Sequence, residues 1–142
     1  MADGCYIIGI TNVWGKDTKD MYIEIDFNSE EALYIQLRNQ IIYGIATRQY
    51  KEGDALPSVR QLAEIVGINM HTVNKAYAVL RQEGLLRLDR RKGAIIALNI
   101  DKLKAIEELR ESLMVILARG FCKGVTREEV HEIVDEIFDE YY

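Results

Sequence analysis

The sequence has few of the features that mark a membrane or secreted protein. Its longest apolar runs, such as residues 113–118, are far shorter than the roughly 18 residues needed to cross a bilayer. No Lys or Arg precedes Lys16, so the basic start of a secretory signal is missing. Cys5 and Cys122 are the only cysteines, and they form neither a CxxC pair nor a disulfide framework. We therefore expect a reduced, cytoplasmic protein with no membrane partner.

Signatures of catalysis and cofactor binding are missing as well. The chain contains no GxGxxG, no GKS or GKT loop, no HExxH and no evident pair of nucleophile and base. His131 and Asp135 lie one helical turn apart, as metal ligands can, but without a third ligand a solvated acidic face is the favoured interpretation. Cys122 is interpreted as a passive cysteine rather than a thiol sensor. We expect no enzyme activity, no cofactor and no metal.

Positive charge is scarce overall but concentrated in one part of the chain. The formal net charge is −5, with 49% hydrophobic and 29% charged residues, as in an ordinary globular protein. Residues 51–100 nevertheless carry 8 basic and 5 acidic side chains, including the consecutive Arg90, Arg91 and Lys92. Because local potential rather than net charge governs contact with phosphates, the composition does not exclude nucleic acid.

The first fifty residues predict strands followed by a helix. Residues 6–10 can form a short strand whose partner the pattern leaves open. Residues 22–27 alternate apolar and polar side chains, which is strand periodicity. Asn28 and Ser29 have N-cap chemistry, so we expect the first helix over residues 30–50.

Pro57, the only proline, stiffens the loop that follows the first helix. Ser58 can then cap a second helix over residues 59–66. We expect Tyr34 and Tyr77, which lie on apolar helix stripes, to be core residues with bonded hydroxyls.

The next segment predicts a third helix and a hairpin. Asn69 can cap a helix over residues 70–82. Residues 85–88 and 94–98 then read as strands on either side of a charged turn at residues 89–93.

Two short helices joined by a tight turn, with a helix before and a hairpin after, indicate a winged helix-turn-helix. The predicted fold is mainly α with a small β-hairpin wing. We place the winged helix-turn-helix domain at residues 28–98, between an N-terminal extension at 1–27 and a two-helix tail at 99–142.

The third helix must present small polar side chains outward if it is to enter a groove about 12 Å wide. Its outward face and its start meet this requirement, because their side chains can bond base edges or phosphates. An Arg in the preceding helix can cross a phosphate strand, and the hairpin tip carries cations suited to the minor groove. The residues expected to bind double-stranded operator DNA are Arg60, Asn69, His71, Thr72, Asn74, Lys75, Arg90, Arg91 and Lys92.

A winged helix that binds protein without binding DNA is the alternative. Such a module would present an apolar or acidic face on its third helix. The face predicted here is polar to basic, which favours DNA.

The tail predicts a helical hairpin. Apolar positions recur at helical spacing over residues 101–119, and Thr126 begins a capping box with Glu129 ahead of a fifth helix. A lone hairpin has little to bury itself against, so its stripes can cover part of the winged domain or a second copy. We predict a homodimer, with recognition helices about 34 Å apart on a palindromic site. The residues assigned to dimerisation are Leu103, Ile106, Leu109, Leu113, Leu117, Ile133, Ile137 and Phe138.

Three segments together carry a specific combination of residues: LPSVRQLA at 56–63, NMHTVNKAY at 69–77, and a Leu followed by GLL at 80–86. The combination resembles the DNA-binding domain of the GntR family of bacterial transcription regulators, over roughly residues 30–98. Many members have basic residues where this chain has Met70 and Asn74. We include Ser58, which precedes the helix of Arg60, among the predicted contacts. Contacts implied by the resemblance are Arg60, Asn69, His71, Thr72, Asn74 and the wing glycine Gly93.

Only 44 residues follow position 98, enough for two helices but not for an enclosed effector pocket. A short two-helix tail is similar to the YtrA subfamily, in which the tail is a dimerisation element and the regulators commonly repress operons that encode ABC transporters. The resemblance implies a repressor. It leaves open whether a small-molecule effector exists.

Overall fold

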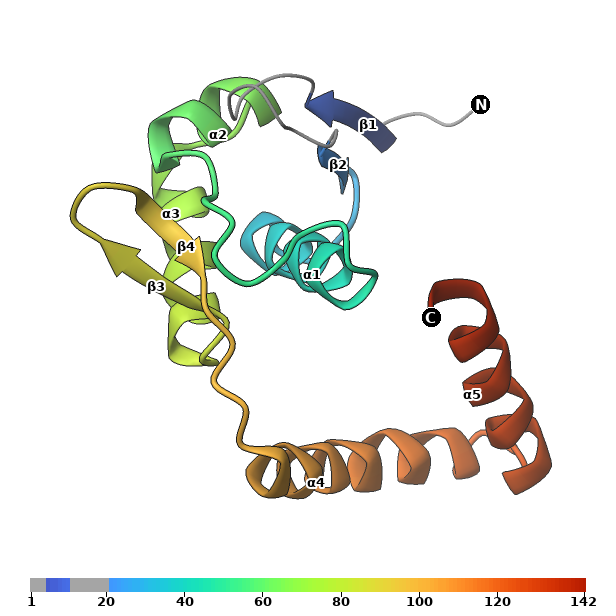
Figure 1. Cartoon of the computed structure of the whole chain (residues 1–142). Coiled ribbons are helices and arrows are strands. Elements are labelled where there is room, and N and C mark those ends of the chain that lie inside the picture. Colours follow the sequence, from blue (N-terminus) through green and yellow to red (C-terminus); the bar gives the residue numbers. More distant parts are fainter. Residues whose placement is uncertain (1–4, 11–20) are drawn as a thin grey trace. The chain divides into compact units, whose positions relative to one another are not determined.

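A computed structural model describes residues 5–10 and 21–142, with side chains from Ile23 onward. The chain divides after Asn99 into two compact units (Figure 1). The fold is mainly α with a small hairpin wing and a helical tail, as predicted. The first unit holds β1 (Cys5–Ile10), β2 (Met21–Asp26), α1 (Leu33–Ala46), α2 (Val59–Val66), α3 (Met70–Gln82), β3 (Leu86–Asp89) and β4 (Gly93–Ile96), and the second holds α4 (Lys102–Phe121) and α5 (Arg127–Tyr141).

The two N-terminal strands pair with each other. β1 and β2 are antiparallel, with Ile8 opposite Ile23. This pairing supplies the partner that the sequence pattern left open. β2 packs against α1 and places Ile23 and Ile25 fully inside the core of the first unit.

The start and end of α1 differ from the prediction. Asn28 and Ser29 were expected to cap a helix over residues 30–50, but α1 begins at Leu33 and has no side-chain cap. The Ser29 hydroxyl instead accepts the backbone N–H of Glu31 within a turn. The helix ends at Ala46 because the chain soon turns into the left-handed region, at a φ of 61° two residues later.

Gln36 explains the late start of α1. Its buried side chain accepts the N–H of Asp26 at 2.8 Å and donates to the carbonyls of Asp26 and Glu31 at 3.0 and 2.9 Å. These bonds satisfy backbone groups of the last residue of β2 and of the turn before α1. A side chain that reaches ten residues back gives no local sequence signal.

The helix-turn-helix forms as predicted. Ser58 accepts the N–H of Gln61, and the Gln61 side chain accepts the N–H of Ser58, which completes a capping box for α2. Gly67 ends α2 with a φ of 75°. Asn69 caps α3 by accepting the N–H of His71 at 2.8 Å.

The hairpin wing is tied to the loop before α2. β3 and β4 pair from Leu86 opposite Ile96 to Asp89 opposite Gly93, so the strands begin and end within two residues of the prediction. The loop adds a bridge from Ala55 to β4 and a bond from the N–H of Leu56 to the carbonyl of Ala94. The base of the wing is therefore held on both edges of β4.

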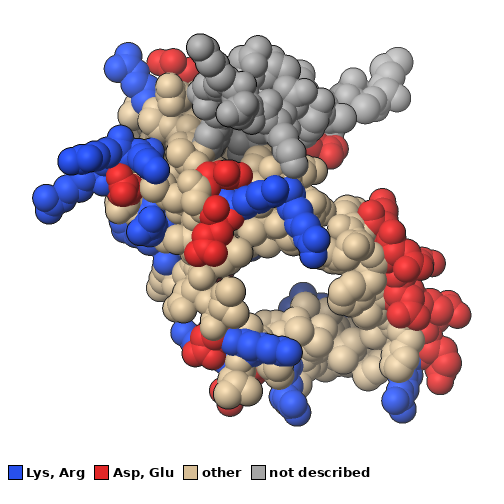
Figure 2. All heavy atoms as spheres, in the orientation of Figure 1, with Lys and Arg blue, Asp and Glu red and all other residues tan. Residues whose placement is uncertain are grey.

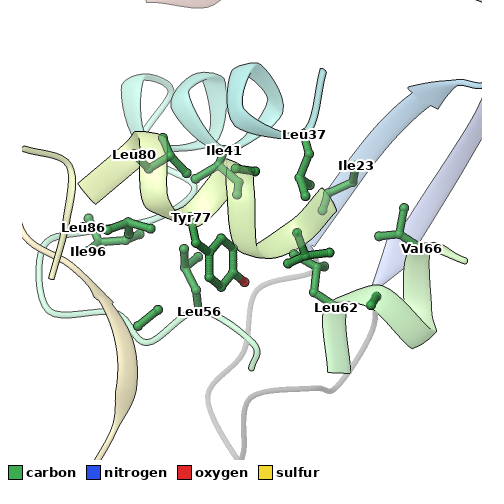
Figure 3. Packing of buried hydrophobic residues seen from close by; sticks show 14 of the residues in the cluster. Ile23, Leu37, Ile41, Leu56, Leu62, Val66, Tyr77, Leu80, Leu86 and Ile96 are labelled. Atoms are coloured by element: carbon green, nitrogen blue, oxygen red, sulfur yellow. The ribbon is translucent and has the colours of Figure 1, made fainter. Parts of the chain in front are cut away.

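One apolar core joins every element of the first unit that has described side chains. Figure 3 shows side chains from β2, α1, α2, α3 and the hairpin converging on it. Tyr77 is buried as predicted, and its hydroxyl donates to the carbonyl of Pro57 at 2.8 Å. Tyr34 packs against this core but is only partly buried. The fully buried large side chains are Ile23, Ile25, Leu37, Ile41, Leu62, Val73, Leu80 and Ile96.

Tyr77→Phe should lower the free energy of unfolding by about 1–3 kcal/mol, because the buried carbonyl of Pro57 would lose its donor. Urea denaturation followed by circular dichroism measures this loss. Tyr43→Phe is the matched control at an exposed position and should stay within about 0.5 kcal/mol of the parent. An equal effect of the two changes would contradict a structural role for the Tyr77 hydroxyl.

The same variant should change the response to alkaline pH. Burial raises the pKa of Tyr77 above its usual value of 10, with Tyr50 adding to the shift. A raised pKa in the folded state means that stability is intact below pH 10 and falls as the unfolded chain ionises above it. Tyr77→Phe should make this fall shallower, and Tyr50, whose pKa burial raises to about 12, accounts for part of what remains.

Candidate nucleic-acid interface

α3 has one face in the core and the opposite face in solvent. Helical geometry of 3.6 residues per turn places the buried Val73 and Tyr77 on one side. The exposure predicted for His71, Asn74 and Lys75 is confirmed, whereas Thr72 is partly buried. The exposed face has no large apolar side chain in its centre. Its contact with DNA stays a prediction.

The capping residues of α2 and α3 keep donors available after capping. The Asn69 side-chain oxygen is occupied by the N–H of His71, which leaves its NH₂ group to donate. The Ser58 hydroxyl accepts the N–H of Gln61, and its own proton is still able to donate to a phosphate. Both caps are exposed. Each cap can therefore serve its helix and a nucleic acid at once.

Arg60 lies in the first turn of α2, as expected, and forms an ion pair with Glu64 one turn on. The Nε and Oε1 atoms are 3.4 Å apart, with 78% and 68% of the two side chains exposed. Exposed pairs of this spacing contribute only about 0.3–0.5 kcal/mol. A phosphate can replace Glu64 at little cost.

Lys75 has a partner that the sequence did not reveal. Its Nζ lies 4.0 Å from the centre of the Tyr34 ring, on α1. Such a cation–π contact is worth about 0.5–1 kcal/mol at an exposed site. Arg38 on α1 also pairs with Glu83, the C-cap residue that follows α3, at 3.9 Å. The contact with Tyr34 places the Lys75 ammonium on the α1 side of the recognition face.

The wing tip is shaped by Asp89, a residue that sequence reasoning did not single out. Its carboxylate accepts the N–H groups of Arg91 and Lys92 at 2.8 and 2.9 Å. These two bonds hold the pKa of Asp89 below its usual value. Gly93 follows with a φ of 77°, which explains the glycine. The Asp at the start of a tight turn ending in Gly was the available signal.

Cations gather at this tip. The predicted Arg90, Arg91 and Lys92 are all exposed. Figure 2 shows Lys and Arg side chains clustered there and acidic side chains clustered on α5. The negative net charge of the chain therefore does not describe the potential at the wing.

A cleft separates α3 from the wing. One wall is the α3 row of Asn74, Ala78 and Arg81, and the other is Arg87 and Leu88 on β3. Sequence reasoning included Asn74 but missed both arginines of the cleft, because only folding brings strand and helix together.

The tail contains the predicted helices. Asp101 caps α4, and Thr126 and Glu129 form the predicted capping box at α5. No residue of either helix is buried. Leu117 is partly exposed, and the other residues assigned to dimerisation are exposed: Leu103, Ile106, Leu109, Leu113, Ile133, Ile137 and Phe138. Within the second unit taken by itself, the stripes are thus uncovered.

Two further candidates from the sequence lie in the tail. His131 and Asp135 belong to no group of three or more potential metal ligands among those residues. Cys122 is a free, exposed thiol at the end of α4. No described helix is both long and apolar enough to cross a membrane.

Asp89→Ala should speed amide exchange at Arg91 and Lys92 several-fold, because both N–H groups lose their acceptor. Asp89→Asn keeps a side-chain oxygen and should retain most of the protection. In the parent, the lowered pKa of Asp89 means that the charged acceptor persists as pH falls to the usual value of 3.8, and below it the protection should drop to about that of the Asn variant. Amide exchange measured by NMR across this range checks both points, and equal exchange in the two variants would refute the turn.

Known proteins are similar to this chain along most of its length. The family described as "Bacterial regulatory proteins, gntR family" matches residues 30–96. The transcriptional repressor YtrA of Bacillus subtilis (strain 168) is 35% identical over 119 residues, which cover 81% of this chain and 91% of that protein. Because this match is longer than the winged segment, it includes sequence beyond it.

Solved structures agree. A protein titled as a transcriptional antiterminator from Listeria monocytogenes EGD-e has a TM-score of 0.72 and 31% identity, with 80% of this chain and 87% of that chain covered. YtrA from Sulfolobus acidocaldarius, a GntR-family transcription factor, has a TM-score of 0.60 and 37% identity over 70% and 97% of the two chains. The resemblance inferred from the motifs is confirmed: the chain belongs to the GntR family and is a DNA-binding transcriptional regulator similar to YtrA.

Proposed function

We propose that this regulator is a repressor that binds a palindromic operator as a homodimer. The observation that carries the proposal is the solvent-exposed polar face of α3 beside a cationic wing. A repressor acts by occupying a promoter, which requires stable binding to one duplex site and no chemistry. The repressor YtrA, to which this chain is similar, supports that direction of control.

In this proposal α3 lies in the major groove. Asn74 projects from the middle of the exposed face, and its side chain has both a donor and an acceptor. These match the N7 acceptor and the N6 donor of adenine in the major groove. His71 and Thr72 lie two to three residues nearer the start of α3, where recognition helices contact bases. Lys75, which contacts Tyr34 on α1, would bind a phosphate at the edge of the groove, and the cation–π contact supports this role by holding the ammonium toward α1.

The wing supplies contacts that do not read individual base edges. Arg90, Arg91 and Lys92 extend from a turn that Asp89 holds in one conformation. Guanidinium groups gain from the negative potential of a narrow minor groove. The wing therefore adds affinity, while α3 supplies sequence preference.

The tail supports dimerisation through the water-exposed apolar area of its helices. Leu113, Met114, Val115 and Ile116 are consecutive, so they point in all directions around α4, and 38–67% of each is exposed. A helix that is apolar all round is normally surrounded by protein. A second copy supplies the missing helices, and two-fold dimers match two-fold operators.

The regulated genes follow only from the resemblance to the YtrA subfamily. On that ground we propose an operon that encodes a transporter. The mechanism of promoter occupancy does not require a small-molecule effector.

Asn74→Ala should reduce the preference for operator over random duplex by about 5- to 150-fold, the range for a lost base contact. Arg91→Ala should lower the affinity for both duplexes by the same factor. It should also reduce the steepness of log affinity against log salt by about 0.9. The operator comes from selection in a random duplex pool, and fluorescence anisotropy at several salt concentrations gives the affinities.

Two outcomes would contradict these roles. If Asn74→Ala lost the same affinity for operator and for random DNA, Asn74 would not contact a base. Absence of salt-dependent binding to any duplex would favour the alternative, a winged helix that binds protein.

Leu113→Asp should convert the dimer to a monomer at micromolar concentration, because it places a charge in the proposed interface. Ser112→Asp adds the same charge just before this apolar stretch, at a position that is already polar and whose hydroxyl bonds the carbonyl of Glu108. It should leave the dimer intact. Sedimentation equilibrium measures both, and a monomeric parent protein would refute the dimer.

A further inference from the structure

The cleft between α3 and the wing is lined by cations that the proposed contacts leave unused. Arg81 projects from the last turn of α3, and Arg87 lies on the facing strand β3. Both side chains are exposed. Between them the cleft has apolar lining, with Leu88 at 65% exposed on the wing wall and Tyr77 on the helix wall.

Neither arginine has a carboxylate within ion-pair distance among the described residues. Arg60 and Arg38, in contrast, are paired with Glu64 and Glu83. Arg87 helps to lower the pKa of Asp89, but only through space and beyond 4.0 Å. Two like charges that line one cleft repel each other, and an anion between them would offset that cost.

The geometry of a duplex indicates which anion passes there. The major and minor grooves are separated by a single sugar–phosphate ridge. A protein that places a helix in one groove and a loop in the next must straddle this ridge. With α3 in the major groove and the wing tip in the minor groove, the ridge runs over the cleft that Arg81 and Arg87 line.

We propose that Arg81 and Arg87 grip one backbone phosphate of this ridge from opposite walls. The planar guanidinium group suits two parallel bonds to phosphate oxygens. Leu88 and the apolar lining lie where the adjoining deoxyribose would rest. The inference rests on the proposed placement of α3 and the wing on DNA, and it adds two residues to the binding surface.

A shared phosphate has a specific signature in the salt dependence. One remaining arginine still neutralises the phosphate, so Arg81→Gln and Arg87→Gln should each change the slope of log affinity against log salt by less than about 0.5. The double variant should lower the slope by about 0.9. Random duplex is the probe, and fluorescence anisotropy from low to high salt gives the slopes.

Matched variants keep the interpretation clear. Lys123→Gln removes one exposed cation in the tail and should leave the slope unchanged. Arg81→Lys with Arg87→Lys keeps both charges and should restore the slope lost in the double Gln variant, which separates charge from any defect in folding. Thermal unfolding by circular dichroism confirms that each variant is folded.

A modified duplex locates the contact. Methylphosphonate linkages are placed one at a time along the selected operator, and each removes one phosphate charge. The linkage at the phosphate between Arg81 and Arg87 should weaken binding by the parent protein. The double Gln variant should be insensitive to that linkage.

Each other result has a defined meaning. Unchanged slopes in the double variant would overturn the grip while leaving DNA binding intact. A slope loss of about 0.9 for each single variant and about 1.8 for the double would indicate two separate phosphates and overturn the shared one. A third result would assign the cleft to a free anion: inorganic phosphate at constant ionic strength competes with duplex for the parent protein, and no methylphosphonate position in the operator weakens binding. A parent protein that binds no duplex would refute the proposed function itself.

Discussion

The buried face of α3 is the constraint on which the rest of the winged unit depends. Val73, Tyr77 and Leu80 fix the rotation of this helix against α1, α2 and the hairpin. The bond from the Tyr77 hydroxyl to Pro57 adds a polar link to the loop before α2. Because the buried side of α3 cannot rotate, its opposite side always points to solvent. The exposed polar residues of α3 therefore form one surface.

Local chemistry made much of this unit predictable from sequence. The bounds of α2 and α3 follow from Ser58, Gly67 and Asn69, whose capping bonds and backbone angle involve residues within a few positions. The wing tip was predictable for the same reason, since its turn ends in Gly93. Where a helix has its own capping residues, its ends can be predicted from the local sequence alone.

Long-range contacts were not predictable in this way. The start of α1 depends on Gln36 bonding back to Asp26, and the position of Lys75 depends on Tyr34, which is far away in sequence. Arg81 and Arg87 face one cleft only because β3 folds against α3. The periodicity of β2 was evident, but nothing local indicated that Ile23 would be fully buried beside α1.

The division of α3 into two faces has a consequence for how such a regulator changes its target. His71, Asn74 and Ala78 are exposed, and none belongs to the apolar core. Substitutions at these positions leave the packed side untouched, and surface changes of this kind usually alter stability by no more than about 0.5 kcal/mol. A duplicated copy of the gene can therefore acquire a new binding site through a few substitutions that hardly change stability, while its architecture is inherited unchanged.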